Sequence, residues 1–184
     1  MAMTVDEIIT LLQQRGQAMY GGEPVSQLDH ALQCAHLAEQ AGEAPETVAA
    51  ALLHDLGHLV ARDEDALADD IDHLDDLHQY AALPLLSPLF PEAVLAPIRL
   101  HVDAKRYLCA IEPGYWDTLS LESQRSLELQ GGVFTEAQMA HFEQQPFAHE
   151  AARLRRYDDS AKTPDCATPG LDHYRTMLQQ VALH

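Results

Sequence analysis

A charged pair, His54 and Asp55, interrupts an otherwise apolar run that extends from Ala49 to Leu56. Burying an ionised carboxylate alone is prohibitively costly, so Asp55 must be either exposed or paired. Exposure would require the helix to turn its apolar face to solvent. Neighbouring side chains on a helix point about 100° apart, so both residues serve one site most readily when it lies between helices. A metal ion is the natural candidate.

Apolar residues recur at helical spacing almost throughout, and alternating strand patterns are nearly absent, which predicts an all-α chain. A length of 184 residues suits one domain spanning residues 1–184. Ser26 with Asp29 and Thr135 with Gln138 have the spacing of capping boxes. Residues 112–116 are expected to form a turn and a loop over the bundle. The expected helices span residues 5–15, 26–41, 45–60, 74–83, 92–108, 120–130, 147–162 and 171–182.

The net charge of −18 argues against nucleic acid or an anionic membrane as a partner, because such surfaces demand clustered Lys and Arg. No stretch approaches the roughly 20 apolar residues that cross a bilayer, and no basic-then-apolar leader precedes the first helix. We therefore expect a soluble, cytoplasmic protein. The acidic run Asp63–Asp76 is expected to be mostly solvated. Three scattered cysteines favour neither a disulfide framework nor a zinc knuckle, and Cys34 is interpreted as helix packing.

Both lysines of the chain lie close in sequence to proposed metal ligands. Lys105 lies four residues after His101, and Lys162 lies four residues after Asp158. In a chain so poor in lysine, this placement suggests positive charge kept near the site for an anionic substrate. Arg155 likewise shares a helix face with Asp158.

Imidazoles and carboxylates without thiolate suit iron, manganese or a similar cation. If Asp55 gave one oxygen to each of two ions, it would hold them about 3.5 to 4 Å apart. Taken alone, His30 is more simply a buried core residue. His73 is a rival ligand, and His58 is either a ligand or a substrate contact. The remaining histidines are expected on the surface or in the core. The expected ligands are His30, His54, Asp55 and Asp158 for one metal, with His78 and His101 on the other beside Asp55.

The order of these residues resembles that of the HD-domain superfamily, in its binuclear branch. A closer resemblance is to the mixed-valent di-iron oxygenases related to myo-inositol oxygenase, in particular the phosphonate-cleaving branch typified by 2-amino-1-hydroxyethylphosphonate dioxygenase. The matching strings extend from Tyr20 to Lys162. They are YGGEPVSQLDHALQ, AALLHDLGHL, LHVDAKRYLCAIEPGYWDTLS, SLELQGG and LRRYDDSAK.

This resemblance implies a helical bundle with a buried Fe(II)/Fe(III) pair and O2 as co-substrate. It implies cleavage of the C–P bond of a 1-hydroxyphosphonate, giving phosphate and a carboxylic acid such as glycine or glycine betaine. Tyr20 matches a loop tyrosine that can occupy an iron site, and Glu23 matches its companion acid, which could attract a substrate ammonium. An aromatic such as Tyr20 or Tyr115 could instead face a quaternary cation. The implied phosphonate contacts are His58, Lys105, Ser123, Ser126 and Arg155.

Two other functions remain open from the sequence. The same ligands can activate water, so a metal-dependent phosphohydrolase of a nucleotide or another phosphomonoester would release phosphate without oxygen. A noncatalytic HD sensing module would bind metal or ligand without turnover. The sequence does not decide among a primary amine, a trimethylammonium group and an unsubstituted phosphonate, nor does it indicate the oligomeric state.

Overall fold

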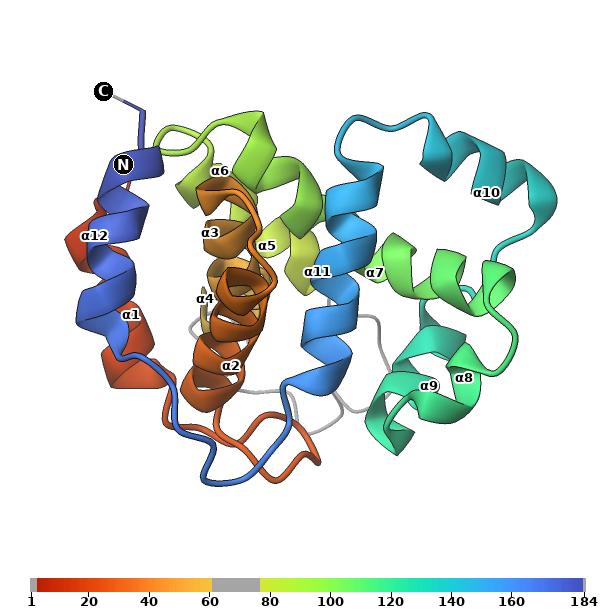
Figure 1. The fold of residues 1–184 in the computed structure, drawn as a ribbon, viewed down its shortest axis with the longest axis horizontal. Coiled ribbons are helices and arrows are strands. Elements are labelled where there is room, and N and C mark those ends of the chain that lie inside the picture. Colours follow the sequence, from red (N-terminus) through yellow and green to blue (C-terminus); the bar gives the residue numbers. More distant parts are fainter. Residues whose placement is uncertain (1–2, 61–76, 184) are drawn as a thin grey trace.

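The computed structural model describes residues 3–60 and 77–183, and over these ranges the chain is helical, without a strand (Figure 1). A single isolated bridge joins Met19 and Ser26. The all-α prediction is confirmed. The helices are α1 (Val5–Arg15), α2 (Gln27–Gln40), α3 (Pro45–Leu53), α4 (Leu56–Val60), α5 (His78–Ala81), α6 (Leu83–Leu86), α7 (Glu92–Ile111), α8 (Tyr115–Thr118), α9 (Leu121–Leu129), α10 (Glu136–Glu143), α11 (Ala148–Ser160) and α12 (Leu171–Val181).

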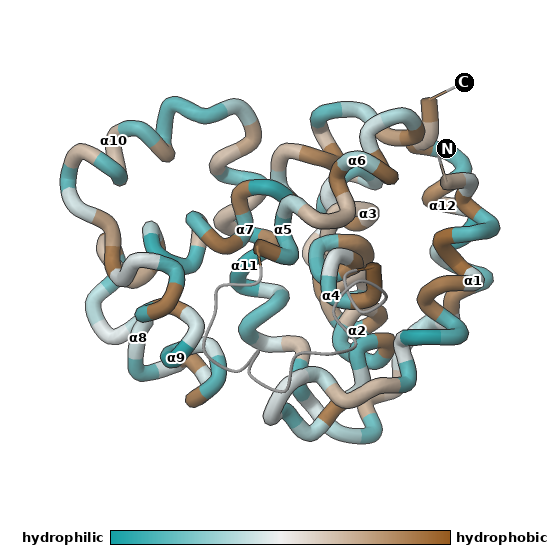
Figure 2. Tube along the Cα trace, turned by 180° about the vertical axis from the view of Figure 1, so that it is seen from behind, coloured by the Kyte–Doolittle hydropathy of each residue, from teal (hydrophilic) through white to brown (hydrophobic). Residues whose placement is uncertain are grey.

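The helices α2, α3, α7 and α11 form the centre of the molecule. α11 packs against α7 and α2, while α3 packs against α2 and α7. α1 and α12 lie together on one side of this group, and α8, α9 and α10 lie beyond α7 on the other (Figure 1). The main apolar core is built from α1, α2, α3, α7 and α12, and smaller apolar clusters join α7 to α8 and α10. α11 is central yet carries many hydrophilic residues (Figure 2), which indicates that the middle of the bundle serves a polar site.

Side-chain caps fix where several helices begin. The capping boxes expected at Ser26 and Thr135 are both present and are confirmed. A third box, which the sequence analysis did not anticipate, joins Thr4 to Glu7 at the start of α1. Each such cap typically stabilises a helix by about 1 kcal/mol. Pro45 begins α3 and Gly42, with φ 76°, follows the end of α2, as expected.

The single helix expected over residues 45–60 is wrong, because the chain turns at its middle. α3 ends at Leu53, His54 and Asp55 lie in a turn, and α4 begins at Leu56. A continuous apolar pattern does not reveal such a turn. Gly57 allows α4 to approach α5 closely, because a Cβ atom there would lie 2.0 Å from the carbonyl oxygen of His78. The turn therefore directs two polar side chains into the bundle instead of along one helix face.

The helix expected over residues 74–83 is also corrected. Residues 74–76 and the acidic run before them lie outside the described residues. The described part contains two four-residue helices, α5 and α6, which meet at Ala82. Pro84 stands in the first turn of α6, where it has no N–H to bond back into α5.

The loop expected at residues 112–116 contains the start of α8, and α7 extends to Ile111 instead of 108. Across the described ranges, no helix combines the length and apolarity that a membrane span needs.

Candidate metal centre

Six polar side chains from five parts of the fold meet in the middle of the bundle. Each is at least nine-tenths buried, with a relative exposure of 8% or less. Such burial of histidines and aspartates is unusual unless each is paired or bound. The contributors are His30 on α2, His54 and Asp55 in the turn between α3 and α4, His78 at the start of α5, His101 on α7 and Asp158 on α11.

The first group of atoms surrounds one carboxylate oxygen of Asp55. Its Oδ2 lies 3.3 Å from Nε2 of His54 and 3.6 Å from Nε2 of His30. Asp158 approaches the same two imidazoles, at 3.4 Å from His30 and 3.7 Å from His54. The two imidazole Nε2 atoms are themselves 3.4 Å apart. Four side chains with potential ligand atoms therefore converge here, and Asp158 approaches with a different oxygen on each imidazole.

The second group surrounds the other oxygen of the same carboxylate. Oδ1 of Asp55 lies 3.2 Å from Nε2 of His78 and 3.6 Å from Nε2 of His101. These two nitrogens are 3.0 Å apart. One carboxylate thus directs its two oxygens at two separate sets of nitrogen donors, which is the arrangement that a bridging ligand between two metal ions requires.

Backbone carbonyls fix the ring orientation of three histidines. In each case Nδ1 lies within hydrogen-bond distance of a backbone carbonyl, which requires that Nδ1 carry the proton and leaves the Nε2 lone pair directed inward. Such backing is common for metal-binding histidines. The pairs are His30 with Ala161 (2.8 Å), His54 with Ala51 (2.9 Å) and His101 with Ile98 (2.7 Å).

Two buried carboxylate oxygens in this cluster lack a conventional partner. Oδ2 of Asp55 and Oδ1 of Asp158 accept no hydrogen bond from any described residue, although both are inaccessible to solvent. Burial would raise the pKa of Asp55, but the neighbouring histidines, chiefly His54, hold it well below its usual range. Burial lowers the pKa of His101 to about 4, so that imidazole is neutral. Anionic oxygens without hydrogen-bond donors, 3.3 to 3.6 Å from imidazole Nε2 atoms, fit a cation held between them.

Two other candidate ligands lie next to these six, because Asp55, His58 and His78 offer ligand atoms within 4.8 Å of one another, as do His30, Cys34 and His54. His58 is more distant, with Nε2 3.9 Å from Oδ1 of Asp55, and its ring stacks on His78 at 4.1 Å. Cys34 Sγ lies 3.6 Å from Nε2 of His30, but burial raises the pKa of this thiol well above its ordinary value, so it is a protonated neighbour of the cluster. His73, the rival ligand, lies outside the described residues.

Tyr20 covers one side of the cluster. Its ring stacks on His30, with centroids 3.9 Å apart and planes 13° apart. Burial of the hydroxyl, together with Asp158 and Asp55, raises the pKa of Tyr20 well above its usual value, so the phenol stays protonated. The loop that carries Tyr20 also carries Glu23, whose backbone N–H donates to the Tyr20 carbonyl at 2.9 Å.

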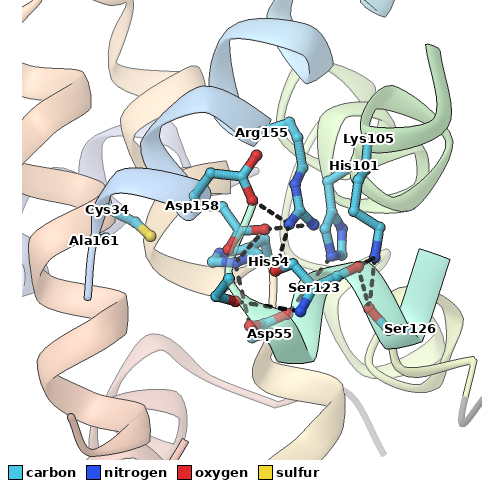
Figure 3. A network of polar contacts seen from close by, with 12 residues as sticks. Cys34, His54, Asp55, His101, Lys105, Ser123, Ser126, Arg155, Asp158 and Ala161 are labelled. Carbon is cyan, nitrogen blue, oxygen red and sulfur yellow. Dashed lines mark hydrogen bonds and ion pairs between the residues drawn. The ribbon is translucent and has the colours of Figure 1, made fainter. Parts of the chain in front are cut away.

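A cluster of cations lies beside the carboxylates and meets at one serine (Figure 3). Oγ of Ser123 accepts from Nζ of Lys162 at 3.1 Å and from Nη2 of Arg155 at 3.4 Å. Lys105 donates to the Ser123 carbonyl at 3.2 Å and to Oγ of Ser126 at 2.6 Å. Burial, and then repulsion from Arg155, lower the pKa of Lys105 to about 7. In a chain of net charge −18, this gathering of cations makes the cluster a candidate site for an anion.

Arg155 joins this cation cluster to the candidate metal centre. Its Nη1 lies 2.8 Å from Oδ2 of Asp158, and its Nη2 pairs with Asp159. Asp159 in turn accepts a hydrogen bond from the Tyr115 hydroxyl. The guanidinium is 5% exposed, so two carboxylates offset its charge in a nearly dry environment. One buried side chain therefore contacts both a proposed metal ligand and Ser123.

The structure thus brings the six expected ligands together, and it places Lys105, Ser123, Ser126 and Arg155 in one adjoining cluster. Lys162, whose positive charge was expected near the site, lines the cluster as well. Sequence reasoning missed two contributors, Ser120 and Asp159. Asp159 alone has no feature that indicates a role. Its position directly after Asp158 and close to Arg155 was the clue that the sequence offered.

Comparison with known proteins gives consistent matches over nearly the whole chain. A sequence model of the HD domain family matches residues 28–131. Hydroxymethylphosphonate dioxygenase of Gimesia maris is 45% identical over 184 residues, covering 98% of this chain and 89% of that protein. The glycine-betaine-forming 1-hydroxy-2-(trimethylamino)ethylphosphonate dioxygenase of Leisingera caerulea is 38% identical, covering 96% and 89%. An uncharacterised protein of Acanthamoeba polyphaga mimivirus is 34% identical, covering 95% and 80%.

Proposed function

The chain belongs to the HD domain family, and we propose that it is a metal- and O2-dependent enzyme that cleaves the C–P bond of a 1-hydroxyphosphonate. For hydroxymethylphosphonate, one O2 is consumed and the products are formate, phosphate and one proton. The two curated relatives with phosphonate dioxygenase names support this reaction class. The more specific proposal is that the metals are two iron ions in the Fe(II)/Fe(III) state.

The observation that carries the proposal is the junction of two sites through Arg155. A phosphohydrolase and an oxygenase would both need a metal centre, and a noncatalytic sensor could keep one. Here a buried cluster of cations also contacts a proposed metal ligand directly. Such a cluster favours a small anion as the bound molecule. Together with two relatives that are 45% and 38% identical to this chain and are named as phosphonate dioxygenases, it favours a phosphonate.

The metal ligands we propose fall into two sets that share Asp55. Bound there, the iron pair would supply the redox chemistry and the activation of oxygen. Backbone carbonyls behind three of the four imidazoles hold their Nε2 atoms in place, so little reorganisation of these ligands is needed. The first set is His30, His54, Asp55 and Asp158, and the second is Asp55, His78 and His101.

The phosphonate, in this proposal, binds in the cation cluster. Arg155 offers guanidinium donors and Lys105 an ammonium, while Ser123 and Ser126 supply hydroxyls to the remaining acceptor oxygens. In the structure these groups bond to one another, so the phosphonate would replace internal hydrogen bonds with charge-assisted ones. Since Arg155 also holds Asp158, binding the anion here brings the carbon atom next to phosphorus towards the metal centre.

Tyr20, Glu23 and His58 are proposed to border the substrate. The Tyr20 ring lies against a proposed iron ligand and would have to withdraw for the substrate hydroxyl to approach the metal. His58 is about a quarter exposed and stacks on His78, so its imidazole is accessible to a substrate beside the second metal. Glu23 lies in the same loop as Tyr20, so movement of the two is coupled through their backbone hydrogen bond.

The direct test measures oxygen uptake and phosphate release together from iron-loaded protein supplied with hydroxymethylphosphonate. We expect equal amounts of O2 consumed, phosphate released and formate formed. Phosphate released from a phosphomonoester under strict anaerobiosis would instead identify a hydrolase. Tight binding of iron and phosphonate without turnover would identify a sensing module and refute the proposal.

A further inference from the structure

Two side chains of α2 hold the chain segment that follows α11. The helix has ended at Ala161, where φ is −88° and ψ is 52°, and residues 161–163 form no helix or strand. Nε2 of Gln33 donates to the Thr163 carbonyl at 2.9 Å, and the Thr163 N–H donates to Oε1 of Gln33 at 3.1 Å. These two hydrogen bonds form the Gln33 clasp. One turn earlier on α2, Nδ1 of His30 lies 2.8 Å from the Ala161 carbonyl oxygen.

The amide of Gln33 suits this task, because it offers a donor and an acceptor side by side. One residue, Thr163, satisfies both with its own carbonyl and N–H. The Gln33 side chain is only 4% exposed, so without these bonds its amide would be buried and unpaired, which is costly. Gln27, also on α2 and 7% exposed, makes no side-chain hydrogen bond with the residues that the structure describes. Burial on this helix therefore does not by itself produce a clasp.

The clasped segment carries one group of the metal centre and one group of the cation cluster. The Ala161 carbonyl fixes the ring of His30, whose Nε2 faces the other proposed ligands. The next residue is Lys162, whose Nζ donates to Oγ of Ser123 at 3.1 Å. Backbone outside a helix or sheet has no regular hydrogen bonds to hold it, so its position depends on contacts such as the clasp. Gln33 thus stabilises the backbone from which both groups extend.

We propose that Gln33 is a positioning residue that, through its clasp on Thr163, sets the affinity of the His30 side of the centre for metal and of the cation cluster for an anion. This inference rests on the proposed function. His78 and His101 are positioned by α5 and α7, whereas the clasp joins α2 to the segment after α11. Loss of the clasp should therefore weaken one metal position and spare the other. A residue that only stabilises the fold would not distinguish the two positions.

The test removes the clasp in two ways. Gln33→Met keeps the size of the side chain without its hydrogen bonds, and Gln33→Asn keeps the amide but withdraws it by one methylene. Two controls leave the clasp intact. Gln27→Met makes the same change at the other buried glutamine of α2, and Thr163→Ala removes an exposed side chain while its backbone partners remain.

Each full-length protein is loaded anaerobically with Fe(II) and dialysed against graded concentrations of a chelator, and the iron bound per chain is measured. In both Gln33 variants the dissociation constant of one iron should rise about 10- to 100-fold, as is typical when the support of a metal ligand is lost. That of the other iron should stay within about twofold of wild type.

Inorganic phosphate is the probe for the cation cluster, titrated by calorimetry at an iron concentration that fills both positions. In the Gln33 variants its dissociation constant should rise about fivefold or more, because the ammonium of Lys162 is no longer held beside Ser123. Both controls should remain within about twofold of wild type in each measurement.

Equal weakening of both irons, or an unchanged affinity for either iron or phosphate, would overturn the inference. Thermal melts show whether the variants fold, and if only one Gln33 variant folds, its affinities decide. If neither melts cooperatively, Gln33 serves folding and the positioning role is refuted. A wild type that binds two irons and phosphate but does not cleave hydroxymethylphosphonate would refute the proposed function alone, because the affinity ratios of the variants would still decide the role of Gln33.

Discussion

Replacing Asp159 with Asn tests whether this carboxylate holds Arg155 in place. Asp159 pairs with Nη2 of Arg155 and accepts the Tyr115 hydroxyl, and its side chain is only 10% exposed. Removing one partner of a buried ion pair typically costs about 3 to 5 kcal/mol. Since Arg155 keeps its 2.8 Å contact with Asp158, we expect the lower end of that range, about 3 kcal/mol. For a chain of this size that corresponds to a fall in Tm of roughly 6–12 °C.

The matched control is Asp117→Asn, which makes the same chemical change on the exposed surface of α8. It should alter the free energy of unfolding by no more than about 0.5 kcal/mol. Urea denaturation of both variants measures the difference, and KM for the phosphonate should rise in Asp159→Asn because the guanidinium loses one of its two anchors. Asp159→Asn that is as stable as Asp117→Asn, with an unchanged KM, would refute the claim that Asp159 positions Arg155.

Two further perturbations have definite expected outcomes. The pKa of Lys105 is about 7, so this ammonium loses its charge as the pH rises through that value; kcat/KM for the phosphonate should fall over the same interval. Lys105→Arg keeps its charge and should move this decline to higher pH in a pH–rate profile, and a decline that stays in place would assign it to another group. Gly57→Ala places a Cβ atom 2.0 Å from the His78 carbonyl oxygen and should destabilise the fold by at least about 1–3 kcal/mol, with fewer metal ions bound per chain. Gly170→Ala, where a Cβ atom meets nothing within 4 Å, is the control, and equal melting temperatures for the two variants would show that α4 and α5 are not constrained as described.

Local patterns predicted the helices well where the signal was a cap or a periodic face. Ser26 and Thr135 act through side-chain contacts three residues away, so sequence spacing alone specifies them. The turn at His54 and Asp55 was missed because the flanking residues are apolar on both sides, and their pattern is the same for one helix or two. After the turn, α4 packs closely on α5 through Gly57 and the His78 backbone, a contact between segments distant in sequence.

The candidate site likewise has a part that the sequence predicted and a part that it did not. Residue types and order predicted which imidazoles and carboxylates converge, because few other reasons place an aspartate in an apolar run. We expected one oxygen of Asp55 for each metal, and in the structure its two oxygens do face different histidine pairs. The sequence did not show that Lys162 pairs with Glu23, which lies 139 residues away. Partners of this kind are set by tertiary packing, so spacing along the chain carries no information about them.

The central claim is that Asp55 bridges two metal ions, and anomalous diffraction at the iron edge from crystals of the iron-loaded protein tests it most directly. The account predicts two peaks, one bounded by His30, His54 and Asp158 and the other by His78 and His101, with one oxygen of Asp55 directed at each. A single peak, or two peaks that do not share Asp55, would contradict it.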